Sequence, residues 1–227
     1  MKIAIIPARG GSKRIPRKNI KLFHGKPMIA YSIEAALQSG CFDKVIVSTD
    51  DKEIAEVAVK YGAEVPFIRP SDISGDHATT MDVMHHAITW CENHGHKIES
   101  VCCVYATAPF VTAEFLQQGL TRLEKEGGEF VFSATSFPFP IQRAIKLSAS
   151  GEVSMFYPEN EQVRSQDLDE AYHDAGQFYW GKKEAFLERT SVFSSHSSVV
   201  LLPRCRVQDI DTQEDWEFAE ALFQLMQ

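Results

Sequence analysis

Short apolar runs alternate with amphipathic segments along the first half of the chain. Residues 3–6, 44–49 and 100–105 are compact runs rich in Val, Ile and other apolar residues, which is typical of buried strands. Between them, residues 28–37 and 54–61 carry apolar side chains at helical spacing. This alternation predicts a mostly parallel sheet with helices on both faces.

The same pattern accounts for most of the remaining chain. The polar loop 71–80 ends in hydroxyl residues where the N-cap of a helix is expected. Thr212 and Asp215 have the spacing of a capping box ahead of a closing helix. Further expected elements are strands at 63–68, 129–135, 176–180 and 198–202 and helices at 112–126 and 182–188.

The alternation breaks between Phe137 and Asp174, where no segment has the pattern of a buried helix. Two apolar stretches, 141–147 and 152–156, flank Ser148–Gly151, and we expect a β-hairpin that reaches away from the main sheet. Such a hairpin must bury its apolar face against another surface. That surface could belong to a partner subunit or to the hairpin's own domain.

Composition favours one ordinary globular domain. In 227 residues, 44% hydrophobic and 24% charged residues are typical values, so we expect a single domain over residues 1–227 with an excursion at 137–156. No run approaches the roughly 20 apolar residues of a membrane span. The five scattered cysteines fit reduced thiols better than a disulfide framework. We therefore expect a cytoplasmic protein that contacts no membrane.

The charge distribution is uneven. The formal net charge is −8, yet eight of the 23 Lys and Arg residues precede Glu34, the first carboxylate of the chain. An acidic protein is a poor general nucleic-acid binder, so no nucleic-acid partner is expected and the local cations indicate a site. The natural partner of such a site is a small polyanion.

The segment from Pro7 to Asn19 concentrates these features. A β-branched run stops at Pro7 and opens into Gly10 and Gly11, a hydroxyl and several cations. Glycines let backbone N–H groups approach an anion, and Arg and Lys neutralise it. The segment matches neither the P-loop nor the three-glycine dinucleotide pattern. A solvated basic turn is the alternative, but the carboxyl edge of a parallel sheet is where ligands bind.

Two carboxylates near the other end of the chain complement this loop. Asp209 and Asp211 are two residues apart, so on extended backbone both point to one side and could grip a divalent cation. Magnesium is the expected ion beside phosphates. Alternatively, Asp211 only helps to cap a helix while Asp209 pairs with a lysine. The acid pair and the cationic loop together fit a metal-bound nucleoside triphosphate.

Other candidate residues carry less information. His173 and Asp174 lie beside Gly176, where a polar loop delivers them to the sheet edge, although simple loop structure explains them equally well. The Cys and His residues around Cys91 match no zinc spacing, and Ser133 lacks the frame of a nucleophile elbow.

The segments 8–19, 45–50 and 208–212 together resemble the signature blocks of the cytidylyltransferases that activate nine-carbon sialic-type sugars. The resemblance runs essentially from end to end. It implies a Rossmann-like three-layer α/β domain of the nucleotide-diphospho-sugar transferase type, CTP and Mg²⁺, and a homodimer formed through the hairpin region 137–156. Sialic acid synthetases place an arginine and an Asn-Gly pair in the segment that corresponds to residues 172–180. This chain has neither there, and the segment resembles instead the members of the family that use pseudaminic acid.

The resemblance also implies roles for individual residues. Lys13, Arg9 and Asp211 would be catalytic, and Asp209 and Asp211 would hold the metal. Tyr105 lies where related synthetases carry a sugar-contacting glutamine. The nucleotide-binding residues would be Ala8, Arg9, Gly10, Gly11, Ser12, Lys13, Lys18, Asn19, Thr79 and Thr80, and the substrate-binding residues Tyr105, His173, Asp174, Gln177 and Tyr179.

The implied reaction is in-line attack by the sugar's anomeric hydroxyl on the α-phosphorus of CTP, with pyrophosphate as the leaving group. Positioning and charge neutralisation would supply most of the acceleration. The same reaction on legionaminic or N-acetylneuraminic acid is an alternative. A non-catalytic nucleotide-binding partner protein is an alternative of another class. Its expected mark, loss of Lys13 or of the acid pair, is absent from this sequence.

Overall fold

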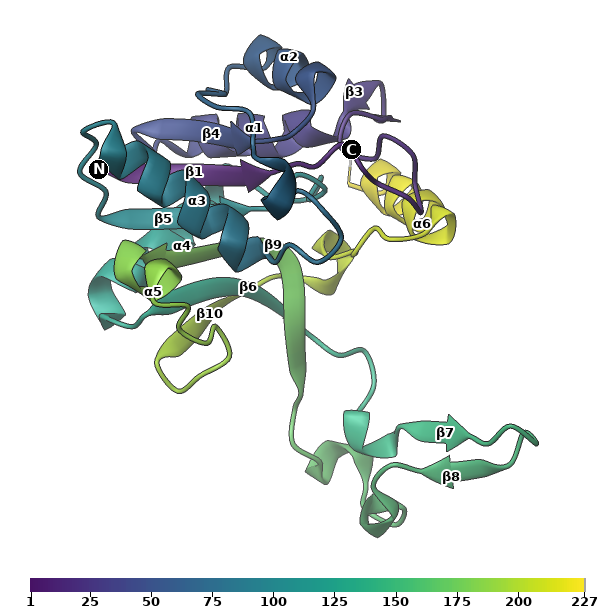
Figure 1. Ribbon diagram of the computed structural model, residues 1–227. Helices are drawn as coiled ribbons and strands as arrows, with labels where there is room; N and C mark the ends of the chain where they lie inside the picture. Colours follow the sequence, from purple (N-terminus) through teal and green to yellow (C-terminus); the bar gives the residue numbers. More distant parts are fainter. Residues whose placement is uncertain (227) are drawn as a thin grey trace.

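The computed structural model describes residues 1–226; Gln227, the last residue of the expected domain, lies outside that range. A six-stranded sheet of order β10-β6-β9-β5-β1-β4 forms the centre of the molecule (Figure 1). The pairs β1–β4, β1–β5 and β6–β10 are parallel, which confirms the predicted mostly parallel sheet. The strands are β1 (Lys2–Pro7), β4 (Lys44–Ser48), β5 (Ser100–Val104), β6 (Phe130–Ser136), β9 (Tyr172–Lys182) and β10 (Ser197–Leu201).

Strand β9 runs antiparallel to both of its neighbours, β5 and β6. It begins at Tyr172, four residues before the start expected from the sequence. The chain returns to the sheet here from an excursion rather than through a crossover helix, so it enters from the opposite direction. The register of β6 against β9 shifts between Phe132 and Ala134, and Gly176 takes a positive φ of 61°.

Helices cover both faces of the sheet, which confirms the three-layer architecture. In Figure 1, α3 and α5 lie in front of the sheet and α1 lies behind it. Buried side chains of α1, α2 and α4 form one core, and those of α3 and α5 form a second core on the other face. Among residues 1–226, no helix has both the length and the apolar character needed to cross a membrane. The helices are α1 (Met28–Ser39), α2 (Lys52–Lys60), α3 (Thr80–Asn93), α4 (Ala113–Glu126), α5 (Lys183–Leu187) and α6 (Gln213–Gln224).

Helix α4 approaches the sheet closely because Gly119 has no side chain. A Cβ atom there would lie 2.6 Å from Cδ1 of Trp180 and 3.0 Å from a ring carbon of Phe178. The buried indole of Trp180 donates a hydrogen bond to the carbonyl of Leu116 at 3.0 Å. This close packing fixes α4 on β9.

Residues 63–68 do not form the continuous strand expected from their composition. They make only isolated bridges, of Glu64 to Ile46 in β4 and of Ile68 to Thr49 just after it. Pro66 interrupts the segment, since proline has no N–H for a strand ladder. The short helix η1 (Ser71–Ile73) follows, and a turn at 75–78 leads into α3.

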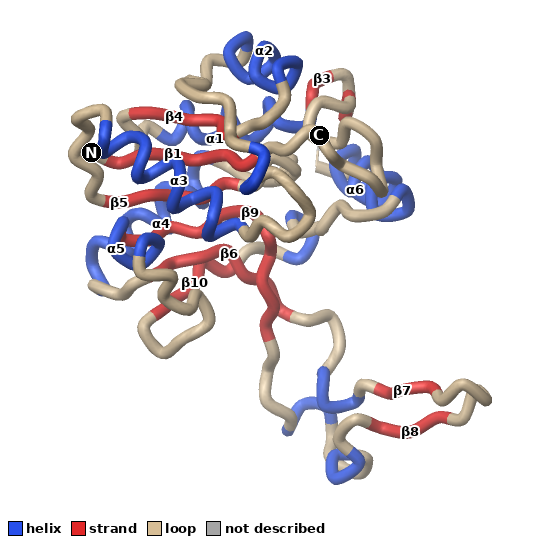
Figure 2. The backbone as a smooth tube through the Cα atoms, in the orientation of Figure 1, coloured by secondary structure: helices blue, strands red, loops and turns tan. Residues whose placement is uncertain are grey.

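An arm, residues 137–171, projects from the ends of β6 and β9 (Figures 1 and 2). Its hairpin consists of β7 (Ile145–Leu147) and β8 (Val153–Met155). The first strand is shorter than expected because residues 141–143 form the 3₁₀ turn η2 (Ile141–Arg143). Two further 3₁₀ turns, η3 (Pro158–Asn160) and η4 (Ser165–Asp167), complete the arm.

The hairpin has one apolar face. Ile145 pairs with Met155 and Leu147 with Val153, whereas Lys146 pairs with Ser154, so the apolar side chains alternate with the polar pair. Leu147 is 67% exposed and Val153 is 64% exposed. The arm therefore presents an apolar surface that the main sheet does not cover.

A third core joins the two ends of the chain. Ile15 and Phe23, which follow β1, pack with Ile210, Trp216 and Ala219 from α6 and the segment before it. Phe23 and Trp216 meet edge to face with ring centroids 5.5 Å apart. The small strands β2 (Leu22–Phe23) and β3 (Lys26–Pro27) and the 3₁₀ turn η5 (Arg204–Arg206) lead into and out of this region. The packing places Asp211 beside the loop after β1.

Candidate active site

A cavity of about 510 Å³ opens at the carboxyl ends of β1 and β5. Its walls come from the loop after β1, the segment 69–80, the first turn of α3 and the residues after β5. The polar and charged lining residues are Arg9, Ser12, Lys13, Arg14, Lys18, Asn19, Arg69, Ser74, Asp76, Thr79, Thr80, Tyr105, Thr107 and Asp211. The cavity is thus lined mainly by cations, hydroxyls and two carboxylates.

The start of the loop after β1 is held by the last residue of β4 and by a residue that follows it. The N–H of Ala8 donates to the carbonyl of Ser48 at 2.9 Å, and the N–H of Gly10 donates to Oδ1 of Asp50 at 2.9 Å. A Cβ atom on Gly10 would lie 2.8 Å from Oδ2 of Asp51. Any larger residue at this position would have to displace the Asp51 side chain. Ala8, Gly10 and Gly11 lie outside the cavity lining, so they shape the loop rather than its charged surface.

Arg17 faces the start of α2. Its Nη1 lies 2.5 Å from Oδ2 of Asp51, and its Nη2 pairs with Glu53. The hydrogen bond from Arg17 lowers the pKa of Asp51 to about 2, against the raising effect of burial. Because Asp51 also caps α2 by accepting from the N–H of Ile54, this pair connects the loop to the helix.

Asn19 supports the loop from inside. It is buried, and its Nδ2 donates to the carbonyl of Arg9 at 2.9 Å. Its own carbonyl accepts from the N–H of Ile29 at 2.8 Å at the start of α1. Asn19 therefore fixes the backbone from which the Arg9 side chain extends.

Four of the five cations that line the cavity fall into two groups, each held by one carboxylate. Asp76 accepts from Nη1 of Arg9 at 2.8 Å and from Nζ of Lys13 at 2.5 Å. Asp211 lies 2.9 Å from Nη2 of Arg14 and 3.4 Å from Nζ of Lys18. These four cations are therefore concentrated at the cavity, and each of them is already paired with a carboxylate of the protein.

The acid pair is only partly within the cavity. Asp211 lines it, whereas Asp209 does not. Asp209 as a whole residue is exposed. Partial burial of its carboxyl group nevertheless raises its pKa, and the negative charge of Asp211 raises it further. A bound cation would relieve this repulsion, so the donor set fits a divalent metal ion. Among residues 1–226, no group of three or more His, Cys, Asp and Glu side chains is arranged to hold a metal, so oxygens from a ligand would be needed.

Asp211 does not cap the closing helix. Thr212 is the N-cap of α6 and forms the predicted capping box with Asp215. The backbone N–H of Asp211 donates to Oδ2 of Asp215 at 3.0 Å, which leaves its side chain facing Arg14 and Lys18. The carboxylate is thus available for a ligand or an ion at the cavity.

A hydroxyl-rich wall of the cavity is formed by Thr79, Thr80 and Tyr105. Thr79 caps α3 in a capping box with Asp82. The Oγ1 of Thr80 lies 3.3 Å from the phenol oxygen of Tyr105, and both residues line the cavity. Burial raises the pKa of Tyr105, so its phenol stays protonated and can donate a hydrogen bond at neutral pH.

The predicted substrate-binding residues on β9 lie behind this wall rather than in the cavity lining. The Tyr179 phenol donates to the Asp174 carboxylate, and its ring centroid is 5.5 Å from that of Tyr105. His173 Nδ1 lies 2.8 Å from the Asp174 carbonyl. Gln177 is 3% exposed and donates its amide to the carbonyl of Arg206. The structure brings Tyr105, Tyr179 and Asp174 together, while Gln177 is directed elsewhere.

Two charged lining residues, Arg69 and Asp76, lie outside every segment that the sequence marks by its charge. Arg69 is 4% exposed and pairs only loosely with Asp50 at 3.8 Å, and burial lowers its pKa. In the sequence, Asp76 stands out only as one residue of the polar loop 71–80. The position of Arg69 in the sequence could have identified it, because a cation that directly follows a strand-like segment is expected at the carboxyl edge of the sheet, where ligands bind. No comparable signal marks Asp76.

Comparison with known proteins adds independent information. A sequence model of the family described as "Cytidylyltransferase" matches residues 3–227. The chain is 50% identical to the pseudaminic acid cytidylyltransferase of Campylobacter jejuni subsp. jejuni serotype O:2, over 98% of this chain and 96% of that protein. It is 36% identical to the CMP-N,N'-diacetyllegionaminic acid synthase of Legionella pneumophila, over 99% and 97% of the two chains.

Solved structures support the fold. The structure of CMP:2-keto-3-deoxy-manno-octonic acid synthetase complexed with CTP is similar to this chain, with a TM-score of 0.71 over 100% of this chain and 99% of that one. The sequence identity is 16%, so this likeness concerns the fold alone.

Proposed function

The chain belongs to the cytidylyltransferase family, and we propose that it transfers CMP from CTP to the anomeric hydroxyl of a nonulosonic acid. We propose pseudaminic acid as that acceptor. The products are the CMP-sugar and pyrophosphate. The observation that carries the proposal is the 50% identity to a pseudaminic acid cytidylyltransferase over nearly the whole of both chains. The cation-lined cavity is what such a reaction requires of the site.

Arg9 and Lys13 bind the triphosphate in this proposal. Both extend into the cavity from the loop whose backbone Asn19 and Asp50 hold in place. The bidentate guanidinium and the ammonium neutralise charge that develops on the leaving pyrophosphate. Because phosphoryl transfer needs little covalent work from the protein, this positioning and neutralisation supply most of the acceleration.

Asp209 and Asp211 hold a divalent cation, and we propose Mg²⁺. When bound, the ion polarises the phosphate and neutralises part of its charge. Its ligation would free Arg14 and Lys18 from Asp211, so that both cations can meet phosphate oxygens. The raised pKa of Asp209 supports the proposal, because burial of its carboxyl and, after that, the charge of Asp211 both disfavour the charged form, and a bound cation would offset these effects.

The nucleoside lies along the wall formed by Thr79 and Thr80, and the acceptor sugar lies near Tyr105. The protonated Tyr105 phenol can donate to a sugar oxygen. Tyr179 and Asp174 support it from behind, and His173 stands at the edge of the same strand. Gln177 would need to leave the Arg206 carbonyl before it could contact the sugar.

We further propose that the arm forms a homodimer. Its apolar face carries Ile145, Leu147, Val153 and Met155 on one side of the hairpin, which a second copy would bury. We also expect the enzyme to work in the cytoplasm, the compartment that supplies CTP.

The proposal is tested by pyrophosphate release from CTP and Mg²⁺ with pseudaminic, legionaminic or N-acetylneuraminic acid offered separately. We expect release with pseudaminic acid, and its loss in Lys13→Met but not in Lys97→Met, which removes a cation outside the cavity. Release with one of the other acids alone would reassign the acceptor. CTP binding without release for any acceptor would favour the nucleotide-binding partner alternative.

A further inference from the structure

Asp76 holds the two cations that we assign to the triphosphate. Its Oδ1 accepts from Arg9 at 2.8 Å, and its Oδ2 accepts from Lys13 at 2.5 Å. The hydrogen bonds from Lys13 and then from Arg9 lower the pKa of the carboxyl, so it is charged at neutral pH. One carboxylate with two oxygens on two cations has the same contacts that a phosphate group would make.

The turn that carries Asp76 is fixed at both ends. On one side, the buried Arg69 donates from Nε to Oγ of Ser74 at 3.2 Å, and that hydroxyl donates to the carbonyl of Pro70 at 2.7 Å. On the other side, Thr79 is held by Asp82, whose Oδ1 accepts from Arg189 at 2.6 Å. The ends of the turn therefore belong to the rigid part of the domain.

The tip of the turn is held much less firmly. Gly75, Asp76 and His77 are exposed, and the N–H of Ala78 donates to the Gly75 carbonyl at 3.3 Å. The hydrogen bonds that Asp76 accepts from Arg9 and Lys13, at 2.8 and 2.5 Å, are shorter than this backbone bond. Because they are surface ion pairs, a ligand of higher charge can replace them at little cost.

From these contacts we propose that Asp76 is a stand-in anion, which keeps Arg9 and Lys13 directed into the cavity and is exchanged for the triphosphate when CTP binds. The 75–78 turn moves aside in this exchange while its ends stay in place. The naming of CTP rests on the proposed function. Asp76 acts as a positioning residue, and its contacts compete with the nucleotide, so the apparent affinity is lower than the intrinsic affinity.

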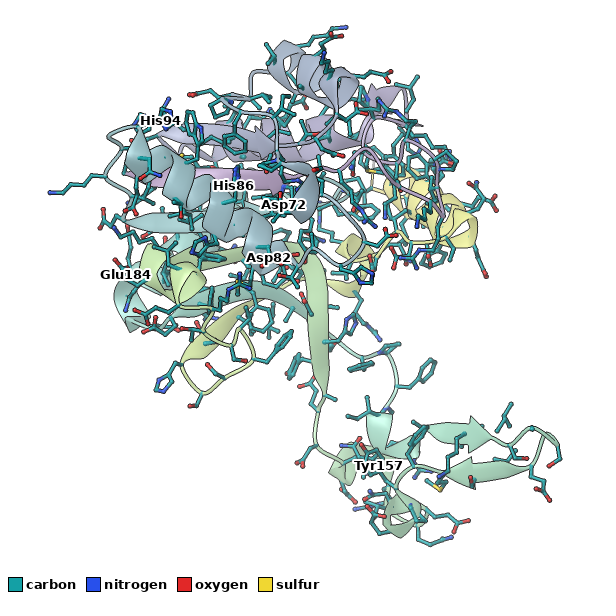
Figure 3. The ribbon with its side chains drawn as sticks, in the orientation of Figure 1. Asp72, Asp82, His86, His94, Tyr157 and Glu184 are labelled. Atoms are coloured by element: carbon teal, nitrogen blue, oxygen red, sulfur yellow. The ribbon has the colours of Figure 1, made fainter. Side chains whose placement is uncertain are left out.

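Neighbouring carboxylates differ from Asp76 in ways that provide controls. Asp211 also holds two cations, but its backbone is hydrogen-bonded to Asp215 at the start of α6. Asp72 lies on η1, in the same connection as Asp76, and lines a separate cavity of about 360 Å³ with Asp82 and His86 (Figure 3). Asp72→Asn thus makes the same charge change without touching the cations of the site.

The test is isothermal titration of the full chain with CTP and, separately, with inorganic tripolyphosphate, in the absence of acceptor. We expect Asp76→Asn to bind both ligands about three- to tenfold more tightly than the unaltered chain, since the competing carboxylate is gone. Asp72→Asn should stay within about twofold of the unaltered chain in the same titrations. Asp76→Ser should reproduce the gain of Asp76→Asn, because the role lies in the charge.

Repeating the Asp76 substitution in a Lys13→Met variant distinguishes direct contact with the cations from a long-range effect of the Asp76 charge. In Lys13→Met, half of the proposed exchange is already lost, so adding Asp76→Asn should tighten binding less than it does beside Lys13. In steady-state assays, Asp76→Asn should lower KM for CTP without raising kcat. A purely structural role for Asp76 would instead change the unfolding midpoint and leave the ligand titrations unaltered.

Several outcomes would overturn the proposal. Weaker or unchanged binding in Asp76→Asn excludes competition, and an equal gain in Asp72→Asn assigns the effect to net charge. If CTP binds the unaltered chain and Asp76→Asn has no effect, the exchange fails while the proposed function stands. If CTP fails to bind but tripolyphosphate binds more tightly to Asp76→Asn, the exchange stands while the proposed function fails.

Discussion

The sheet domain and the arm both contain apolar strands, but they differ in how far the apolar side chains are buried within the chain itself. Strands β1 and β5 are covered on both faces, and their central side chains have essentially no exposed surface. Hairpin β7–β8 is equally apolar on one face, yet Leu147 and Val153 stay mostly exposed. The sheet domain is therefore stabilised by its own helices, whereas the arm needs a second surface. Mutations should follow this division: changes in the cavity alter rate, changes in the arm alter assembly and changes beneath the helices alter stability.

The largest effect is expected at the cavity. Asp211→Ala should lower turnover by about 10³-fold, because the charge on the reacting phosphate is no longer organised, while the unfolding transition stays close to that of the unaltered chain. Pyrophosphate release with a Mg²⁺ titration measures this. Asp72→Ala removes the same charge outside the cavity and should remain active. Retained activity with normal metal dependence in Asp211→Ala would remove it from the metal site.

The next largest effect is expected in the arm. Leu147→Asp places a charge on the apolar face, and burying a leucine is worth about 1.5–3 kcal/mol, so the dimer dissociation constant should rise by at least about tenfold. Sedimentation over a range of concentrations measures it. Ser154→Asp lies on the opposite face of the hairpin and should leave assembly unchanged. A monomeric unaltered chain at all concentrations would show that the arm serves another purpose.

A smaller effect is expected where α4 meets β9. Gly119→Ala inserts a methyl group 2.6 Å from the Trp180 ring, and overpacking of this kind costs about 1–3 kcal/mol, which the helix propensity of alanine partly offsets. Urea denaturation should show a lower free energy of unfolding without loss of the arm's assembly. Gly11→Ala has open space around the added methyl and serves as the matched substitution. Equal stability of both variants would mean that Trp180 can shift.

The smallest effect concerns the ion pair that ties the loop to α2. Asp51 has a folded pKa of about 2 against an ordinary value of 3.8, so its contribution is present above pH 4 and is lost as the pH falls towards 2. Since the Arg17 side chain is partly exposed, we expect about 1 kcal/mol. Urea denaturation at pH 6 and pH 3 should show a smaller pH dependence in Arg17→Gln than in Lys52→Gln. Identical pH dependence would exclude the pair as its source.

Local patterns in the sequence predicted most of the sheet domain, because each signal acts over a few residues. The apolar runs of β1, β4 and β5 and the Thr212–Asp215 capping box are of this kind. The antiparallel direction of β9 depends on where the chain re-enters the sheet after the arm, which no local pattern encodes. The prediction of a continuous strand over residues 63–68 was wrong, because Pro66 has no backbone N–H to donate to a neighbouring strand.

The candidate site was predictable in its charge but not in its pairing. The glycines and cations after β1 and the acids Asp209 and Asp211 stand out in the sequence because their types and spacing are unusual. Which carboxylate holds which cation depends on contacts between distant segments, such as Asp76 with Lys13 across 63 residues. Exposed acids in polar loops are common, so the position of Asp76 can be recognised only once the chain is folded.

The contact of Lys18 with the carbonyl of Ile210, at 2.5 Å, joins residues 192 positions apart. On the ribosome, the loop after β1 emerges early, and its partner segment is still untranslated for most of synthesis. Arg14 and Lys18 must therefore pass this interval without their carboxylate partner, whereas Asp51 and Asp76, which pair with the other cations of the loop, are translated much earlier. Completion of the site is a late, long-range step, and a nascent chain interrupted before α6 would carry the cationic loop without the Asp211 carboxylate that pairs with Arg14 and Lys18.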